Sequence, residues 1–315
     1  MTMEWFILAR AVHFGASLIF FGVFAFDRFT AASIFANNNQ IGAADYYWRS
    51  RVRFFSSILL PVIFVSGSAW FILVAMTMSG QPLSDEILKI VWTQTQFGTV
   101  WKIRLIFWLA AVIVAALFHF RKSQVSFQIF LIWIQLILSG CLLGSLAWAG
   151  HGLEGSRWHL FADVLHLLVA GIWPTGLLPF ALLFHKLRRK PEPAHWNSIA
   201  IFVRRFSAIS LAAVALLAAT GFVNGWFLVG SFSNLVQKTY GRWLLTKIIL
   251  FCFAVAIGAV NLLRLKPRLL MKNAQTQNLE TTANQLRINV QWELVLGAAI
   301  IIVVAVLGIL PPAIH

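Results

Sequence analysis

Long runs of apolar residues, separated by short polar segments, dominate the chain. A membrane-spanning helix needs about 20 mainly apolar residues to cross roughly 30 Å of hydrocarbon. Eight runs meet this requirement: 5–27, 54–79, 101–119, 125–149, 158–184, 204–230, 243–264 and 289–311. Tryptophans, which prefer the headgroup level of a bilayer, mark many of their ends: Trp5, Trp92, Trp101, Trp148, Trp158, Trp226, Trp243 and Trp292. The pattern predicts an all-α fold, a polytopic membrane bundle of about eight helices.

The segments between the runs are too short to fold as separate soluble domains. We therefore expect a single integral-membrane domain over 1–315, in which the polar segment 265–288 forms a surface helix or loop. The first run is longer than a signal peptide and contains Glu4 and Arg10, so we interpret it as a retained helix. No internal repeat, phosphate-binding glycine loop or ATPase motif is evident in the sequence.

Composition and charge support this class of protein. The chain has 315 residues, of which 60% are hydrophobic and 11% charged, which excludes a water-soluble globule and a disordered chain. The net charge of +15 does not indicate nucleic-acid binding, because the basic residues lie in short clusters between the apolar runs. If the N-terminus is outside, most of the 25 Lys and Arg residues fall on inner segments. The positive-inside rule thus predicts that both termini are periplasmic.

Histidines on the outer half provide the first candidate chemistry. His13 lies eight residues after Trp5, and His166 lies eight residues after Trp158. At 1.5 Å per residue, both imidazoles are roughly 12 Å below their tryptophans, and hence at the same depth on different helices. Polar groups at this depth are costly and indicate a functional site. We expect one shared site, although each histidine could instead simply bond a backbone carbonyl or a neighbour.

Other polar residues accompany His166. On the same predicted helix, His159, Asp163 and His166 fall at i, i+4 and i+7, which is one helical face. A carboxylate one turn from a histidine is the usual arrangement for orienting a metal-binding imidazole, so Asp163 is predicted to support the ligands. His151 lies in the short outer loop before this helix.

Methionines favour copper as the metal. Four of the five occur in two pairs, Met1-Thr2-Met3 and Met76-Thr77-Met78, both at predicted outer ends. Thioethers are soft ligands that suit Cu(I), and imidazole also binds copper. The competing interpretation is ordinary packing of methionine in an apolar helix. For Cys141 and Cys252, packing is the expected role.

The remaining intramembrane polar residues have simpler expected roles. We expect Arg10, Lys102, Arg104 and Lys247, all just inside outer helix ends, to extend their charges to the interface. Asn224 and Asn261 are expected to form hydrogen bonds between helices. Glu293 is expected to form an ion pair at the inner interface, where Arg204 and Arg205 also lie.

Several motifs resemble the CopD/PcoD family of copper-resistance membrane proteins. The stretch 145–180 contains the outer-loop histidine, an Asp-x-x-His helix and a Trp-x-x-Gly-Leu ending that look like those of the family, although Pro174 and Thr175 depart from its pattern. Further similar features, Lys247, Asn261 and Glu293, occur in 240–312, and the first run carries a similar Arg-x-x-His. The resemblance implies a copper-handling protein of the bacterial inner membrane, without enzymatic activity, that works with a periplasmic CopC-like copper-binding protein. By motif, it carries over four candidates: His13, His151, Asp163 and His166.

The sequence is compatible with more than one class of function. The first is movement of copper from the periplasm toward the cytoplasm through an outer site, for which the candidate ligands are His13, His151, His159, His166, Met76 and Met78. The alternative is a b-type haem electron carrier, because two depth-matched histidines are what bis-imidazole haem ligation requires. A structural or sensory membrane partner is a third interpretation.

Overall fold

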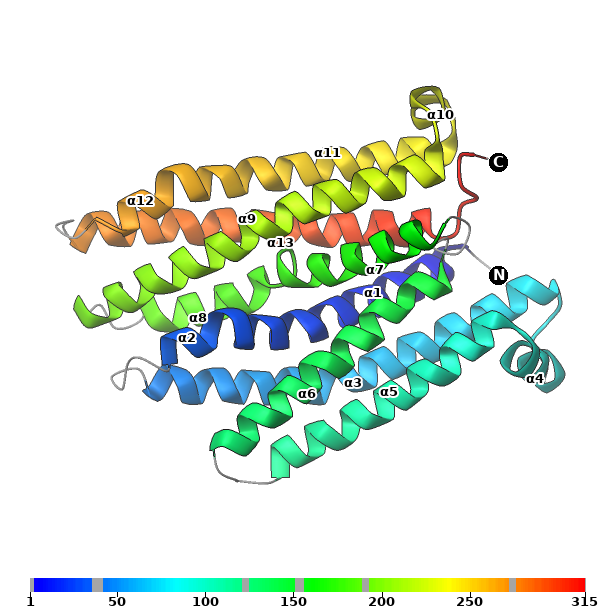
Figure 1. Cartoon of the computed structure of the whole chain (residues 1–315), viewed down its shortest axis with the longest axis horizontal. Helices are drawn as coiled ribbons and strands as arrows, with labels where there is room; N and C mark the ends of the chain where they lie inside the picture. Colours follow the sequence, from blue (N-terminus) through cyan, green and yellow to red (C-terminus); the bar gives the residue numbers. More distant parts are fainter. Residues whose placement is uncertain are drawn as a thin grey trace.

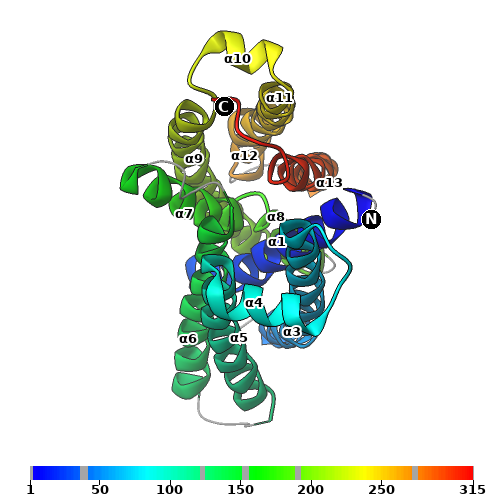
Figure 2. The same ribbon diagram turned by 90° about the vertical axis from the view of Figure 1, so that its right-hand side faces the viewer.

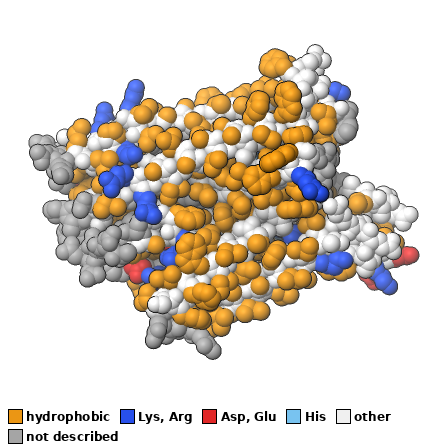
Figure 3. Space-filling model, in the orientation of Figure 1, with side chains coloured by type: hydrophobic (Ala, Val, Ile, Leu, Met, Phe, Trp, Pro, Cys, Tyr) orange, Lys and Arg blue, Asp and Glu red, His pale blue; other side chains and the backbone are white. Residues whose placement is uncertain are grey.

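The computed structural model describes residues 3–35, 42–120, 125–150, 156–188, 193–271 and 276–314, and nearly all of them are helical. Eight helices are long and apolar enough to cross a membrane, as predicted: Met3–Ala31, Ala44–Ser79, Gln96–Phe120, Val125–Ala149, Arg157–Arg188, Ser198–Val229, Thr239–Leu269 and Gln277–Leu307. Figure 3 shows hydrophobic side chains covering the length of one face, with most Lys and Arg toward its two ends. The fold is therefore a polytopic helical membrane bundle.

The spans comprise regular helices joined by short irregular turns. The first half contains α1 (Met3–Phe26), a π-helical turn (Asp27–Ala31), α2 (Ala32–Phe35), α3 (Gly42–Ser79), α4 (Asp85–Gln94), α5 (Gln96–Phe120), α6 (Val125–Gly144) and a 3₁₀ turn (Ser145–Ala149). The second contains α7 (Arg157–Ile172), α8 (Leu177–Arg188), α9 (Pro193–Val229), α10 (Phe232–Gln237), α11 (Thr239–Val260), a π-helical turn (Asn261–Leu265), α12 (Lys266–Leu269) and α13 (Thr276–Leu307).

Helices of each half pack mainly with one another. In the first half, α3 and α6 pack on α1, and α5 packs on α3 and α6. In the second half, α9 packs on α7, and α11 packs on α13. Figures 1 and 2 show these two groups, with both ends of the chain, α4 and α10 at one end of the bundle. We call this the terminal end.

Helices α1 and α7 join the halves by a close crossing. A Cβ at Gly22 would lie 2.6 Å from the carbonyl oxygen of Gly171, and a Cβ at Gly171 would lie 2.5 Å from the ring of Phe21. Glycine is needed at both positions because small residues let membrane helices approach closely. The Thr175 hydroxyl, which donates to the Leu18 carbonyl at 3.1 Å, adds a polar link.

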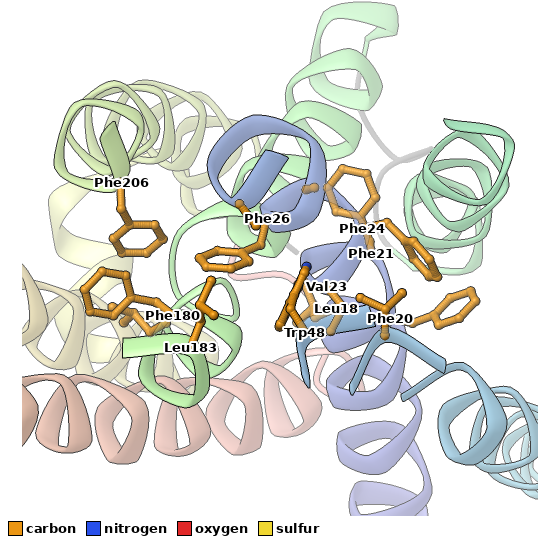
Figure 4. Close-up of a cluster of buried hydrophobic side chains, with 14 of the residues drawn as sticks. Leu18, Phe20, Phe21, Val23, Phe24, Phe26, Trp48, Phe180, Leu183 and Phe206 are labelled. Atoms are coloured by element: carbon orange, nitrogen blue, oxygen red, sulfur yellow. The ribbon is translucent and has the colours of Figure 1, made fainter. Parts of the chain in front are cut away.

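An aromatic core fills the end of the bundle opposite the terminal end. Phe26 packs edge-on to Trp48, and Phe180 stacks on Phe206 with ring centroids 4.6 Å apart (Figure 4). The indole of Trp48 donates to the buried Asp27 carboxylate at 2.7 Å. This core holds the helices rigidly below the polar clusters described next.

The prediction for 265–288 is wrong in part. Its second section, from Thr276 onward, belongs to α13 and continues directly into the last span. Ala283 and Leu286 are buried in the bundle, so this part of the segment is no separate surface element. The helix is simply longer than the apolar run, which the hydrophobic pattern alone does not report.

Candidate functional site

His13 lies in a buried polar cluster formed by three helices of the first half. Its Nε2 is 2.6 Å from Nη2 of Arg104 on α5, and its Nδ1 is 3.1 Å from both the Ile63 carbonyl and the Ser66 hydroxyl on α3. His13 and Arg104 are 1% and 2% exposed. We call His13, Ser66, Gly67 and Arg104 the first cluster.

The hydrogen bonds assign the tautomer of His13. The Ile63 carbonyl can only accept, so Nδ1 carries the proton. The lone pair on Nε2 is therefore the acceptor for the Arg104 guanidinium. Arg104 also donates to the Leu142 carbonyl and the Ser145 hydroxyl, both at 2.6 Å, which fixes the guanidinium in place.

His166 lies in a corresponding cluster of the second half. Its Nδ1 is 2.9 Å from the Thr220 hydroxyl on α9, and its Nε2 is 3.4 Å from the Lys247 ammonium on α11. The Thr220 hydroxyl donates to the Leu216 carbonyl at 2.7 Å, so its oxygen accepts from Nδ1 of His166. Nε2 again presents its lone pair to a cation. We call His166, Thr220, Gly221 and Lys247 the second cluster.

The two clusters are built from equivalent positions. A hydroxyl residue followed by glycine faces each imidazole: Ser66-Gly67 on α3, and Thr220-Gly221 on α9. A Cβ at Gly67 would lie 3.0 Å from the His13 ring, and one at Gly221 would lie 3.4 Å from the His166 ring.

The facing cations are equivalent too. Arg104 and Lys247 each lie six residues after a glycine, Gly98 and Gly241, which packs against the short helix before it. Together with the matching Trp5–His13 and Trp158–His166 spacings, these equivalent positions indicate that the second four spans repeat the first four at the level of the two clusters. This correspondence goes against the expectation of no internal repeat. Both repeats run in the same direction, because four spans return the chain to the side where it started.

The repeats differ in charge. The residue three positions before the histidine is Arg10 in the first half and Asp163 in the second. Asp163 accepts from the Asn224 amide at 3.1 Å and interacts electrostatically with Lys247. Arg10 is buried with its guanidinium 4.6 Å from the Trp70 ring centroid. The first cluster is therefore strongly positive, whereas the second pairs its cation with a carboxylate.

This geometry replaces the expected shared site with two separate ones. Each Nε2 faces its own cation, Arg104 or Lys247, and no described contact joins the two rings. Within the described ranges, no group of three or more His, Cys, Asp or Glu side chains is close enough to hold a metal ion. The spacing alone did not predict that the two rings lie in separate clusters.

The other predicted ligands lie nearer the terminal end. His159 is buried and stacks on Phe227 with centroids 5.1 Å apart. Met76 is half-buried and Met78 is 59% exposed, both in the last turn of α3. His151 lies outside the described residues. No contact described for the other three residues, His159, Met76 and Met78, joins them to His13 or His166.

The expectation that Arg10 and Arg104 extend to the interface is wrong. Both are buried and point into the bundle, where each contacts a neighbouring helix. Sequence position gave their depth, but the rotation of α1 and α5 decides whether a side chain faces lipid or protein. The link between Arg104 and His13 was missed for this reason. The sequence did contain one signal: a charged residue stands three positions before each histidine, Arg10 before His13 and Asp163 before His166.

A third polar cluster lies deeper in the second half. Asn261 donates to the Glu293 carboxylate at 3.2 Å, and Asn289 donates to the Asn261 oxygen at 2.7 Å. Glu293 is 3% exposed and borders a cavity of about 130 Å³ with Asn261, Ser207 and Ser210. The expected interhelical bonds of Asn224 and Asn261 are confirmed. The expected ion pair is wrong, because Asn261, and not Arg204 or Arg205, is the partner of Glu293.

Eight spanning helices with charged residues buried between them define a polytopic helical membrane protein. The model of the family Copper resistance protein D matches residues 200–307, and that of the Copper resistance protein D-like N-terminal domain matches residues 1–159. The chain belongs to the copper resistance protein D family, and it is a copper-handling membrane protein.

Three curated relatives support this assignment. Copper resistance protein D of Pseudomonas syringae pv. tomato is 34% identical over 76% of this chain and 78% of its own length. Copper transport protein CutJ of Bacillus subtilis is 31% identical over 69% of this chain but only 37% of its own length. Inner membrane protein YebZ of Escherichia coli is 28% identical over 75% of this chain and 77% of its own length. No solved structure matches the chain significantly.

Proposed function

We propose that this protein moves copper ions across the bacterial inner membrane, from the periplasm toward the cytoplasm, without catalysing a reaction. The observation that carries the proposal is the position of two carboxyl groups in the same half, one partly buried (Asp163) and one buried (Glu293). Asp163 lies beside His166, and Glu293 lies deeper, bordering its own cavity. The name of CutJ, a copper transport protein, supports the same substrate.

Of the two clusters, the second is the better entrance site for a cation. The Nε2 lone pair of His166 suits copper, and the nearby Asp163 carboxylate offsets the added charge. Without copper, the ammonium of Lys247 occupies the position beside Nε2. Copper that binds Nε2 therefore displaces this ammonium. Unlike Arg104, a lysine can lose its proton in a buried site. Copper arrival is thereby linked to proton release.

Glu293 and Asn261 offer the next site along the route. An ionised carboxylate that is buried without a cation is costly, so a cation reaching Glu293 is favoured. Weak binding at two successive sites is what allows an ion to leave as well as enter. The terminal end, where Met3, Met76 and Met78 lie, is the proposed periplasmic face. There a CopC-like protein would deliver copper.

Copper uptake by proteoliposomes tests the proposal. Purified protein is reconstituted, and Cu(I) entry is measured for the parent, His166→Ala and Asp163→Asn. We expect a loss of at least about tenfold in both variants, as for removal of a ligand or its charge partner. His185→Ala, an exposed histidine on α8, is the matched control and should transport normally. Equal uptake by the parent and both cluster variants would reject the route.

A further inference from the structure

A second cavity lies in the first half of the molecule. It measures about 440 Å³ and lies between α3 and α5, with α4 at its outer end. Aromatic side chains of Phe71, Trp92, Trp101 and Trp108 line it, and His13 and Arg104 are at its inner wall. A volume of 300–1,000 Å³ with mainly apolar walls and a few polar groups is typical of a small-molecule site.

The polar wall of this cavity carries donors that lack acceptors. Among the described residues, neither Nε of Arg104 nor the indole Nε1 of Trp101 has a hydrogen-bond partner, and both atoms are buried. Buried donors of this kind are rare in folded proteins because each one lost its hydrogen bond to water. Both residues line the cavity, so a ligand oxygen could satisfy them.

The charge around the cavity excludes a metal ion as its natural occupant. The ion pairs of the described residues are Arg28–Asp27 and Arg49–Asp45, so neither Arg104 nor the nearby Arg10 is paired with a carboxylate. Lys89 of α4 adds a second positive charge to the lining, beside Arg104. A copper ion beside His13 would meet the Arg104 guanidinium at close range and be repelled. An electron-rich oxygen would be attracted.

We propose that this cavity binds a lipophilic molecule that presents an oxygen acceptor to Arg104 and Trp101. The site lies within the spanning part of the bundle, so such a ligand can enter from the bilayer. A quinone carbonyl and a fatty-acid carboxylate share this chemistry, and the aromatic walls fit the planar ring of a quinone. The two repeats have thus diverged: one holds a cation, and the other holds an acceptor-bearing lipid. This inference does not depend on the proposed copper route.

Binding is tested on the full-length protein in detergent micelles with two probes, decylubiquinone and oleate. Quenching of tryptophan fluorescence gives the affinity of the quinone, and competition gives that of oleate. Trp101→Phe keeps the ring but removes the donor, and we expect an affinity loss of roughly threefold to tenfold. Arg104→Gln should lose about tenfold or more. Lys102→Gln, on the same helix but not in the cavity lining, should bind as the parent does.

Saturable binding that weakens in both cavity variants supports the site. The probe that binds with the higher affinity shows whether a quinone carbonyl or a fatty-acid carboxylate supplies the oxygen. Trp101→Phe retains an aromatic side chain at this position, and its thermal stability is measured beside the parent to show that it folds. Binding of neither probe by the parent would overturn the proposal. Equal affinities for the parent, Trp101→Phe and Arg104→Gln would overturn it as well, since the ligand would then lie elsewhere.

Discussion

The ammonium of Lys247 lies 3.4 Å from Nε2 of His166. Nε2 is the ring nitrogen with an available lone pair, because Nδ1 carries the proton that is donated to the Thr220 hydroxyl. Copper and the ammonium therefore compete for one position. We predict that Lys247→Met raises Cu(I) affinity by about tenfold or more, and that Lys247→Arg lowers it by a similar factor. Affinity is measured against a chromophoric Cu(I) competitor. Unchanged affinity in both variants would show that copper does not bind at Nε2.

Acidification should weaken copper binding. Copper binds the neutral imidazole through its lone pair, so protons compete with the metal for the same nitrogen. Lower pH also keeps Lys247 protonated, which acts in the same direction. We expect affinity to fall progressively as the pH is lowered. Binding that is flat from neutral to acidic pH would instead point to the thioethers of Met76 and Met78 as the main ligands.

Glu293→Gln separates binding from transfer. Glutamine keeps the hydrogen bond to Asn261 but removes the charge that receives a cation. We predict normal Cu(I) affinity at His166 and uptake reduced by about tenfold, a modest estimate for losing a charged partner. Binding and proteoliposome uptake are measured on the same preparation. If uptake is unaffected, the deeper cluster is not on the route.

The glycines of the two clusters should differ in how well they tolerate substitution by alanine. A Cβ at Gly67 would lie 2.8 Å from the Trp101 ring, whereas one at Gly221 would meet its nearest atom, on His166, at 3.4 Å. Gly67→Ala is therefore expected to destabilise the protein by about 1–3 kcal/mol, and Gly221→Ala by clearly less. Thermal unfolding of both variants in the same detergent checks this order. A smaller loss for Gly67→Ala than for Gly221→Ala would contradict the packing described for Trp101.

The spans were predictable because the length of an apolar run is set by the thickness of the bilayer. The equal depth of His13 and His166 stays a prediction from helix rise. Rotation about the helix axis was not available from a single sequence, so Arg104 was wrongly expected at the interface. The repeat escaped notice because its matching residues are few and spread over three spans in each half, and only the bonds at His13 and His166 reveal the correspondence.

Copper content of His13→Ala and His166→Ala, determined by mass spectrometry after exposure of the purified proteins to Cu(I), tests the central claim most directly. The two variants remove equivalent imidazoles from the positive and the charge-balanced repeat. We predict that His13→Ala retains the copper of the parent and that His166→Ala loses most of it. Loss of copper in His13→Ala with full retention in His166→Ala would contradict the assignment of the cation site to the second half.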